Sequence, residues 1–289
     1  MDINSDHNTQ HDAAIAAPPQ TNFFYSTVPP VRLTTHINAL DYNMEHRHRG
    51  VCLIFDIEKF HPSRKLPRRY GSKVDSTALF NLFRSMSFEV MMFQDLTAKE
   101  IRYQLEYYSK LDHSNNDAFA CCILTHGEHG QLWGTDHRFP VDMMFNHFLG
   151  NECPTLAGKP KLFFIQACQG DKLDDGVAVL AQDSIDSTTT YFKIPTHADF
   201  LIAYSTLPGF YSFRNTQEGS WFMQSLIKVL SDYHHDLDLL TMLTIVNHRV
   251  AYYKQSNANT PEFSGKKQVP CITSMLTRRV FLRPKRILI

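Results

Sequence analysis

The sequence lacks an excess of charge of either sign, because its 29 lysine and arginine residues equal its 29 aspartate and glutamate residues. This balance gives no reason to expect binding to nucleic acid or to an anionic membrane surface. The sequence also lacks any apolar run of membrane-spanning length and, at its N-terminus, the basic and then apolar pattern of a signal peptide. We therefore expect no nucleic acid or membrane partner, and a cytoplasmic location.

Cysteine is scarce and is not arranged for cross-linking. The six cysteines include no CxxC pair, and four of them lie within or at the start of apolar, strand-like runs, where a thiol behaves as a small hydrophobic group. The histidines have no thiol or carboxylate at the spacing of a zinc site. We therefore expect reduced cysteines, no metal site and no cofactor.

Two stretches lack a regular apolar period. Residues 1–30 combine isolated aspartates with alanine and proline, which is typical of a flexible leader and not of a folded domain. Residues 171–190 contain five aspartates and end in a serine–threonine run, which indicates a long exposed connector. Loops of this length inside a domain are usually functional or disordered.

The remaining sequence alternates between strand and helix patterns. Apolar runs of strand length predict six strands, at residues 51–55, 88–93, 119–124, 162–165, 200–204 and 271–276. Apolar residues three and four apart predict helices between them, at residues 75–86, 97–108, 141–148, 222–233 and 239–250. We expect Asp75 to cap the first helix, and Thr97 and Glu100 to form a capping box in the second. The alternation predicts a three-layer α/β fold, with a mostly parallel six-stranded sheet and helices on both faces.

Polar residues follow four of the predicted strands and should therefore meet at one edge of a parallel sheet. Cys168 follows the fourth strand and His126 the third, which provides the thiol–imidazole pair that a cysteine nucleophile requires. Gly127 permits close approach of the backbone, so its N–H and that of Cys168 are candidate donors to an oxyanion. Arg69 and Arg214, on two further loops, are candidate ligands of an anionic group. The alternative is a structural cysteine, a histidine that only ends a strand and two solvated arginines.

A longer set of motifs runs through the chain in a fixed order. Gln166-Ala-Cys168-Gln-Gly170 follows an upstream His126-Gly127, a combination that marks one family of cysteine peptidases. Further segments typical of the same family lie at residues 112–114, 125–128, 158–162, 204–206, 208–215, 219–222 and 267–271. Over roughly residues 40–283 the sequence resembles the caspases, and among them the invertebrate effector caspases.

The resemblance implies the three-layer caspase fold and an endopeptidase that cleaves proteins after aspartate in apoptosis. Cys168 would be the nucleophile and His126 the general acid and base, with the Gly127 and Cys168 amides at the oxyanion. Arg69, Gln166 and Arg214 would surround the carboxylate of P1, the residue before the scissile bond. The P2 and P4 subsites and a strand-like contact with the substrate would involve Tyr211, Ser212, Phe213, Arg214, Asn215 and Trp221.

The resemblance also implies a zymogen. Residues 1–30 would be the propeptide, 31–175 the large subunit, 176–190 the cleavable linker and 191–289 the small subunit of one catalytic domain. Candidate processing sites are Asp186, which has aspartate at both P1 and P4, and then Asp183, Asp175 and Asp12. Two pairs of subunits would form a homodimer through the last strand, near residues 269–275. Besides protein substrates, the expected partners are an upstream caspase as activator and proteins of the inhibitor-of-apoptosis type.

Three departures from the family pattern affect specificity more than chemistry. Phe213 stands where many members have tryptophan, Tyr70 where many have a small polar residue, and residues 254–265 are polar where some effector members have aromatics. Two other functions compete with this interpretation. A catalytically silent caspase homologue would act by dimerising with an active enzyme, but the chain has both Cys168 and His126. A nucleotide-binding α/β module would need a glycine-rich phosphate loop, which the sequence lacks.

Overall fold

The computed structural model describes residues 33–175, 196–257 and 260–285. The chain separates into two units, residues 1–32 and residues 33–289, and only the second contains described residues. The expected leader and the candidate processing sites Asp12, Asp183 and Asp186 therefore lie outside the described residues.

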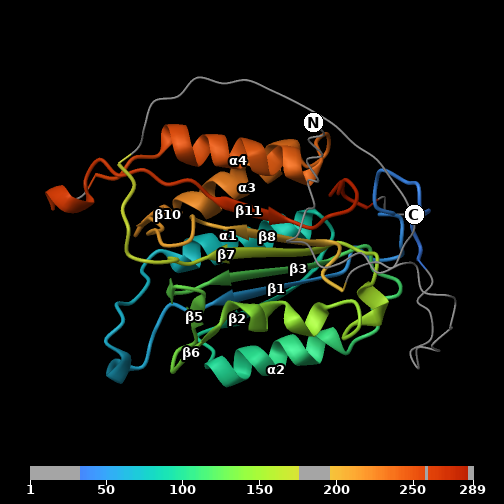
Figure 1. The fold of residues 1–289 in the computed structure, drawn as a ribbon, viewed down its shortest axis with the longest axis horizontal. Helices are drawn as coiled ribbons and strands as arrows, with labels where there is room; N and C mark the ends of the chain where they lie inside the picture. The colour runs from blue at the N-terminus through green and yellow to red at the C-terminus, as the bar shows by residue number, and fades with distance from the viewer. Residues whose placement is uncertain (1–32, 176–195, 258–259, 286–289) are drawn as a thin grey trace, which may run out of the picture. The chain divides into compact units, whose positions relative to one another are not determined.

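Six strands form the central sheet, in the order β11-β8-β7-β3-β1-β2 (Figure 1). Their bounds are β1 Val51–Asp56, β2 Glu89–Gln94, β3 Phe119–Leu124, β7 Lys161–Gln166, β8 Phe200–Tyr204 and β11 Cys271–Ser274. Neighbouring strands run parallel except β8 and β11, which are antiparallel. The expected mostly parallel six-stranded sheet is confirmed, although β11 ends at Ser274 and not at residue 276.

Helices cover both faces of this sheet, as the alternating pattern predicts (Figure 1). The α-helices are α1 Ser72–Ser85, α2 Ala98–Ser109, α3 Trp221–Tyr233 and α4 Leu239–Tyr253. α1, α3 and α4 pack on one face, and α2 packs on the other with the 3₁₀ helices η2 Val141–Met144 and η3 Asn146–Phe148. The three layers are confirmed, but the helix expected at residues 141–148 is wrong, because Phe145 leaves helical geometry at φ −119° and divides it.

Local hydrogen bonds set the starts of the helices. The capping box predicted in α2 is present, because Thr97 Oγ1 accepts from the Glu100 N–H and the Glu100 carboxylate accepts from the Thr97 N–H. The cap predicted at Asp75 is wrong, since α1 begins at Ser72, after Gly71 in a left-handed conformation with φ 86°. The Asp75 carboxylate accepts hydrogen bonds from Ser220 instead.

The strands that lead into the candidate site are the most enclosed. Every residue of β1, β3 and β7 is buried, because these strands have a neighbour on each side and helices on both faces. Their apolar side chains join two clusters, one under each helical layer. Burying apolar surface stabilises the folded state by roughly 25 cal/mol per Å². The buried strands are therefore held firmly, and the loops that follow them start from fixed positions.

Short elements occur in the loops. One small sheet contains β4 Gly127–Glu128, β5 Gln131–Trp133 and β6 Arg138–Pro140, and another pairs β9 Arg214–Asn215 with β10 Gly219–Ser220. Three further 3₁₀ helices are η1 Pro62–Arg64, η4 Pro154–Leu156 and η5 Pro261–Phe263. Elements of two or three residues are too short to show a period in a sequence, so none of them is predicted.

Candidate active site

The parallel pairing of β3 and β7 brings the predicted catalytic residues to one edge of the sheet. The pairing continues just past the strands, where the Thr125 N–H donates to the Gln166 carbonyl at 3.1 Å. His126 and Cys168 follow directly in the two loops. A Cβ built on Gly127 would lie 2.6 Å from the Cys168 carbonyl oxygen, so the two loops touch and only glycine fits there.

The His126 imidazole is held in one tautomer. Its Nε2 lies 2.8 Å from the Pro67 carbonyl oxygen, and because a carbonyl can only accept, Nε2 carries the proton and Nδ1 is left as a base. One face of the ring packs at a tilt on Phe60, with ring centroids 4.8 Å apart. Burial, aided by the charges of Arg69 and Arg214 and opposed by the Pro67 contact, lowers the pKa of His126 to about 4. The imidazole is therefore neutral at pH 7.

Cys168 lies on the turn after β7, and its thiol is partly enclosed. The Ser212 N–H donates to its Sγ over 3.4 Å. Burial raises the pKa of Cys168, although the Ser212 N–H and the charges of Arg69 and Arg214 act in the opposite direction. No hydrogen bond within the described residues joins this thiol to the His126 ring. The resting pair is thus a neutral thiol with a neutral imidazole.

Two backbone N–H groups at this edge are candidates to bind an oxyanion. Trp133 donates to the His126 carbonyl at 3.0 Å, and because hydrogen bonds alternate along an antiparallel ladder, the next N–H, that of Gly127, points away from β5. The Cys168 N–H has no acceptor among the described residues. Free N–H groups on two touching loops are suited to hold a negatively charged oxygen.

Arg69 is buried at this edge with a donor left over. Only 1% of its surface is exposed. Its Nη1 donates to the Ile57 carbonyl at 3.3 Å and to the Ser72 hydroxyl at 2.6 Å, and it lies 3.9 Å from the Asp56 carboxylate. Its Nε has no partner among the described residues. A buried guanidinium donor without an acceptor is costly, so the arrangement favours an anionic ligand.

Gln166 and Arg214 complete the group around Arg69. The Gln166 Nε2 donates to the Ser212 hydroxyl at 2.8 Å, and its Oε1 is buried without a partner in the described part of the chain. The Ser212 hydroxyl can donate as well as accept a hydrogen bond. If the positions of Oε1 and Nε2 in the Gln166 amide are exchanged, Oε1 accepts from this hydroxyl and Nε2 is directed to a ligand. Arg214 donates from Nε to the Tyr70 carbonyl at 2.9 Å. Burial first, and then the charge of Arg214, lowers the pKa of Arg69 to about 9. Two neighbouring guanidinium groups and an amide suit a carboxylate.

Buried carboxylates lie close enough to offset part of this positive charge. Asp75 is 1% exposed and accepts from the Ser220 N–H at 2.9 Å and from its hydroxyl at 2.7 Å. Burial raises the pKa of Asp75 to about 6, against the lowering effect of Ser220 and of the two arginines. Gly219, with φ 97°, is required here, because a Cβ would lie 2.1 Å from the Asp75 carboxylate.

The loop after β8 carries the residues expected to contact substrate beyond P1. Phe213 stacks on Trp221 with ring centroids 4.7 Å apart, and Trp221 is buried, so it supports the Phe213 ring from behind. Tyr211 packs edge-on against Phe263 at 5.7 Å. The Asn215 side chain closes a turn by accepting the N–H groups of residues 217 and 218, so only its backbone remains for a strand-like contact.

The first residues of the connector are paired with the rest of the site. Asp174 forms an antiparallel bridge with Lys267, whose N–H donates to the Asp174 carbonyl at 2.9 Å. The next residue, Asp175, forms an ion pair with Lys266 at 2.6 Å. Proteolysis occurs preferentially in exposed, unpaired chain. The Asp175 side chain is nevertheless 83% exposed and its ion pair lies at the surface, so Asp175 stays a candidate processing site.

The sequence does not reveal what several residues contribute to the shape of the site. Pro67 acts through its carbonyl, which every residue has. Gln268 is buried, accepts from the Phe213 N–H at 2.7 Å and donates to the Ser205 carbonyl at 2.6 Å, and so holds the loop after β8 at both ends. Phe263 is the one aromatic residue in residues 254–265, a segment that the sequence pattern describes as polar.

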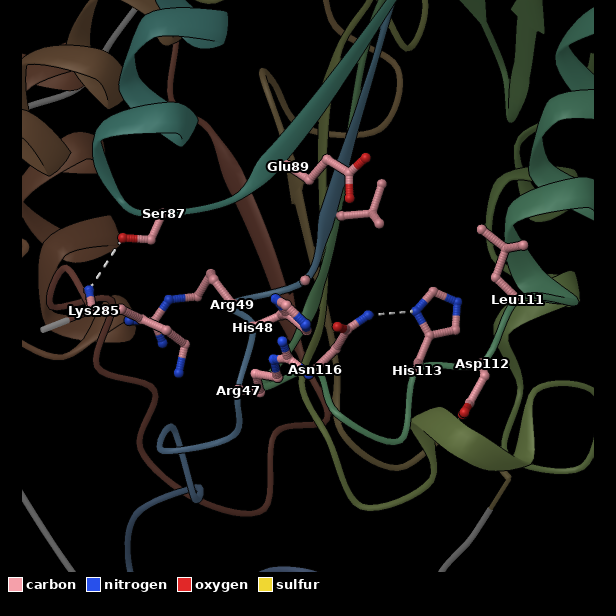
Figure 2. Close-up of a pocket in the computed structure, with 12 residues that line it drawn as sticks. Arg47, His48, Arg49, Ser87, Glu89, Leu111, Asp112, His113, Asn116 and Lys285 are labelled. Atoms are coloured by element: carbon pink, nitrogen blue, oxygen red, sulfur yellow. Dashed lines mark hydrogen bonds between the residues drawn. The ribbon is translucent and has the colours of Figure 1, made fainter. Parts of the chain in front are cut away.

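A cavity of about 480 Å³ lies at the opposite edge of the sheet, around the amino ends of β1, β2 and β3 (Figure 2). Its polar groups are largely paired within the protein. Arg49 and Lys285 both pair with the buried Asp117, at 2.9 and 2.7 Å, and Asn116 donates to His113 at 3.0 Å (Figure 2). Its lining also includes the exposed side chains of Arg47 and Glu89, and it is separate from the Cys168 edge.

Neither a metal site nor a membrane span is found where the structure is described. No group of three or more histidine, cysteine, aspartate or glutamate side chains among these residues is arranged to hold a metal ion. None of the described helices is long and apolar enough to cross a bilayer. All six cysteines are free.

Comparison with known proteins agrees with this geometry. Residues 49–281 match the family model of the caspase domain. The chain belongs to the caspase family. It is 46% identical over 271 residues to Caspase-1 of Drosophila melanogaster, which covers 92% of this chain and 81% of that one. It is 43% identical over 240 residues to Caspase-3 of Mesocricetus auratus, which covers 83% of this chain and 86% of the relative.

A solved structure supports the same assignment. The crystal structure of Caspase-1 from Spodoptera frugiperda matches this caspase with a TM-score of 0.83 and 44% identity, over 89% of this chain and 100% of that one. The expected resemblance to invertebrate effector caspases is therefore confirmed. The protein is a cysteine endopeptidase with specificity for aspartate.

Proposed function

We propose that this caspase cleaves proteins in apoptosis, with Cys168 as nucleophile and His126 as general acid and base. The Sγ proton passes to Nδ1 of His126 as Sγ attacks the carbonyl carbon, and the Gly127 and Cys168 N–H groups stabilise the oxyanion. Collapse breaks the C–N bond, and the imidazolium gives its proton to the leaving amine. Water, deprotonated by the same imidazole, then hydrolyses the thioester and restores the thiol.

Arg69, Gln166 and Arg214 bind the P1 carboxylate. The observation that carries this proposal is the Arg69 Nε, a buried donor without a partner among the described residues, at the same sheet edge as the nucleophile. Aspartate supplies the missing acceptor and a counter-charge for both guanidinium groups. An uncharged P1 residue would leave those groups buried and unmatched, and sites of this kind reject such analogues strongly.

Aromatic side chains provide the neighbouring subsites. The Phe213 ring on Trp221 and the Tyr211 ring on Phe263 offer apolar walls for P2 and P4. The backbone of residues 212–215 meets the substrate as an added strand, which is how many peptides bind an exposed edge.

The enzyme is made as a zymogen and activated by cleavage in the linker. Residues 1–30 are the propeptide, 31–175 the large subunit, 176–190 the linker and 191–289 the small subunit. Asp186 is the preferred linker site, Asp183 and Asp175 are second choices, and Asp12 is the candidate leader site. An upstream caspase is the proposed activator, and inhibitor-of-apoptosis proteins are candidate regulators in the cytoplasm.

The active form is a homodimer of subunit pairs. β11 is the edge strand of the sheet, and its Thr273 and Ser274 are exposed. An edge strand presents unpaired backbone groups, which a second copy can satisfy across a two-fold axis. Sedimentation of the linker-cleaved enzyme should therefore give the mass of two chains, and a single-chain mass would contradict the dimer.

Intact-mass analysis of bacterially expressed wild type and Cys168→Ala tests the proposal. We expect wild type to arrive as two fragments, cut after Asp183 or Asp186, and Cys168→Ala to stay whole. If both stay whole, the linker is cut with an added protease and an aspartate-P1 peptide is offered. Turnover by wild type alone supports the zymogen, and no turnover supports the silent homologue that acts only through dimerisation.

A further inference from the structure

The loop between β1 and α1 has an uneven charge. Residues 57–71 contain one carboxylate, that of Glu58, and five cations, Lys59, Arg64, Lys65, Arg68 and Arg69. Arg69 lies in the P1 pocket, Arg68 pairs with Glu58 at 2.8 Å, and Lys59 lies 3.9 Å from Asp95. Two cations of this loop, Arg64 and Lys65, are left over, and we call them the basic pair.

The basic pair has no counter-charge in the described part of the chain. Arg64 and Lys65 are both exposed, and neither forms an ion pair with a described carboxylate. Arg64 donates to the His137 ring at 3.0 Å. The nearby carboxylates have other partners: Glu128 pairs with Arg138 at 3.1 Å, and Asp136 accepts from the His137 N–H and ring. The excess positive charge therefore faces solvent.

Backbone hydrogen bonds fix the basic pair in place. The Arg64 N–H donates to the His61 carbonyl at 2.9 Å, and the Lys65 N–H donates to the Pro62 carbonyl at 3.2 Å. The His61 N–H in turn donates to Thr135 at 2.7 Å, which ties η1 to the turn between β5 and β6. A ligand that binds here does not need to order the loop, so little affinity is lost to entropy.

The basic pair lies on the leaving-group side of the site. Its loop touches His126 at two points, the Pro67 carbonyl and the Phe60 ring. Since His126 protonates the leaving amine in the proposed mechanism, the substrate chain after the scissile bond passes this loop. Pro67 follows Arg64 by three residues, which places their backbones within about 10 Å of each other. The basic pair therefore borders the first few residues after the scissile bond, P1′ to P4′.

We infer that Arg64 and Lys65 bind acidic side chains at P2′ to P4′, so that this caspase favours protein substrates with aspartate or glutamate shortly after the cut. The inference rests on the proposed function. It adds a preference for acidic residues after the scissile bond to the requirement for aspartate at P1. Ion pairs at exposed sites are weak, so the expected gain in kcat/KM is about 3- to 10-fold at low salt. It should largely disappear near 1 M salt, where the screening length falls to about 3 Å.

Two quenched peptides test the inference. Both carry Asp-Glu-Val-Asp before the scissile bond, followed either by Gly-Glu-Glu-Glu or by Gly-Gln-Gln-Gln. The kcat/KM of linker-cleaved wild type is measured on each, at low and high salt. The variants are Arg64→Gln/Lys65→Gln, the charge-reversed Arg64→Glu/Lys65→Glu, and a matched control, Lys110→Gln/Lys228→Gln, which removes two exposed lysines near α2 and in α3.

We expect wild type and the control to prefer the acidic peptide, the glutamine variant to treat both peptides alike, and the charge-reversed variant to prefer the neutral one. Unchanged kcat/KM on the neutral peptide shows that the His126 side of the site is intact. An acidic-to-neutral ratio near one in wild type, or a ratio that the variants do not change, overturns the inference while the proposed function stands. No cleavage of either peptide refutes the proposed function itself. Retention on immobilised single-stranded RNA is compared between wild type and the variants of the basic pair. If the variants are retained less while the peptide ratios are unchanged, the basic pair binds nucleic acid and the inference is overturned.

Discussion

Replacing Arg69 by glutamine is expected to remove most of the discrimination for aspartate at P1. The guanidinium is buried, is held by Ile57 and Ser72, and has an Nε without a partner among the described residues. Truncating one partner of a desolvated charge pair costs about 2–5 kcal/mol, which is about 30- to 4,000-fold in kcat/KM. Arg214 remains in the variant, so the lower half of this range is expected. The fold should survive, because Asp56 keeps its hydrogen bonds to the hydroxyls of Ser72 and Ser76.

The assay compares kcat/KM on two peptides that differ only in aspartate or asparagine at P1. Arg69→Gln should lower the ratio by about the factor lost on the aspartate peptide. Arg68→Gln is the matched control, because that side chain is exposed and pairs with Glu58 outside the pocket, and it should change the ratio less than about threefold. Urea unfolding of each variant shows whether the fold is retained. Equal loss on both peptides, or an unchanged ratio, would show that Arg69 supports the fold and does not read P1.

Three further predictions concern the oxyanion, the substrate loop and pH. Gly127→Ala should lower kcat by about 100-fold or more, because a Cβ would lie 2.6 Å from the Cys168 carbonyl and displace the loop that presents the N–H; unchanged kcat refutes this role. Gln268→Ala should raise KM several-fold by releasing the Phe213 and Ser205 backbone, and a loss in kcat alone contradicts it. Burial lowers the pKa of His126 from 6.5 to about 4, so the unfolded chain takes up this proton first as pH falls. The stability of Cys168→Ala should therefore decrease from about pH 6.5 towards pH 4, and less steeply when His126 is also replaced by glutamine. Urea unfolding at pH 7 and pH 5 measures this, and equal slopes would contradict the assigned pKa.

Much of the fold follows from local patterns in the sequence. The capping box of Thr97 and Glu100 and the apolar strand of residues 119–124 are local features, and the structure has both. The parallel order of the strands then places His126 and Cys168 at one edge without further information. Patterns of this kind are informative because hydrophobic periodicity and end-capping depend on residues within a few positions of each other.

The parts that could not be predicted depend on residues far apart in the sequence. Asp75 has the chemistry of a helix cap, but its carboxylate is taken by Ser220, 145 positions away. Pro67 orients His126 through a backbone carbonyl, and a carbonyl leaves no mark on the sequence. Residues 141–148 have helical spacing but form two 3₁₀ helices, because the backbone at Phe145 departs from helical geometry. In each case a tertiary contact or a local backbone choice overrides the residue type.

Covalent labelling tests the central claim most directly. Linker-cleaved enzyme is treated with a peptidyl chloromethyl ketone that ends in aspartate, and in parallel with one that ends in asparagine, and the labelled cysteine is located by peptide mapping. The account predicts one adduct, on Cys168, formed with the aspartate reagent and lost in Arg69→Gln. Labelling of another cysteine would contradict the assignment of Cys168 as the nucleophile. Equal labelling by both reagents would contradict the claim that the arginines select aspartate at P1.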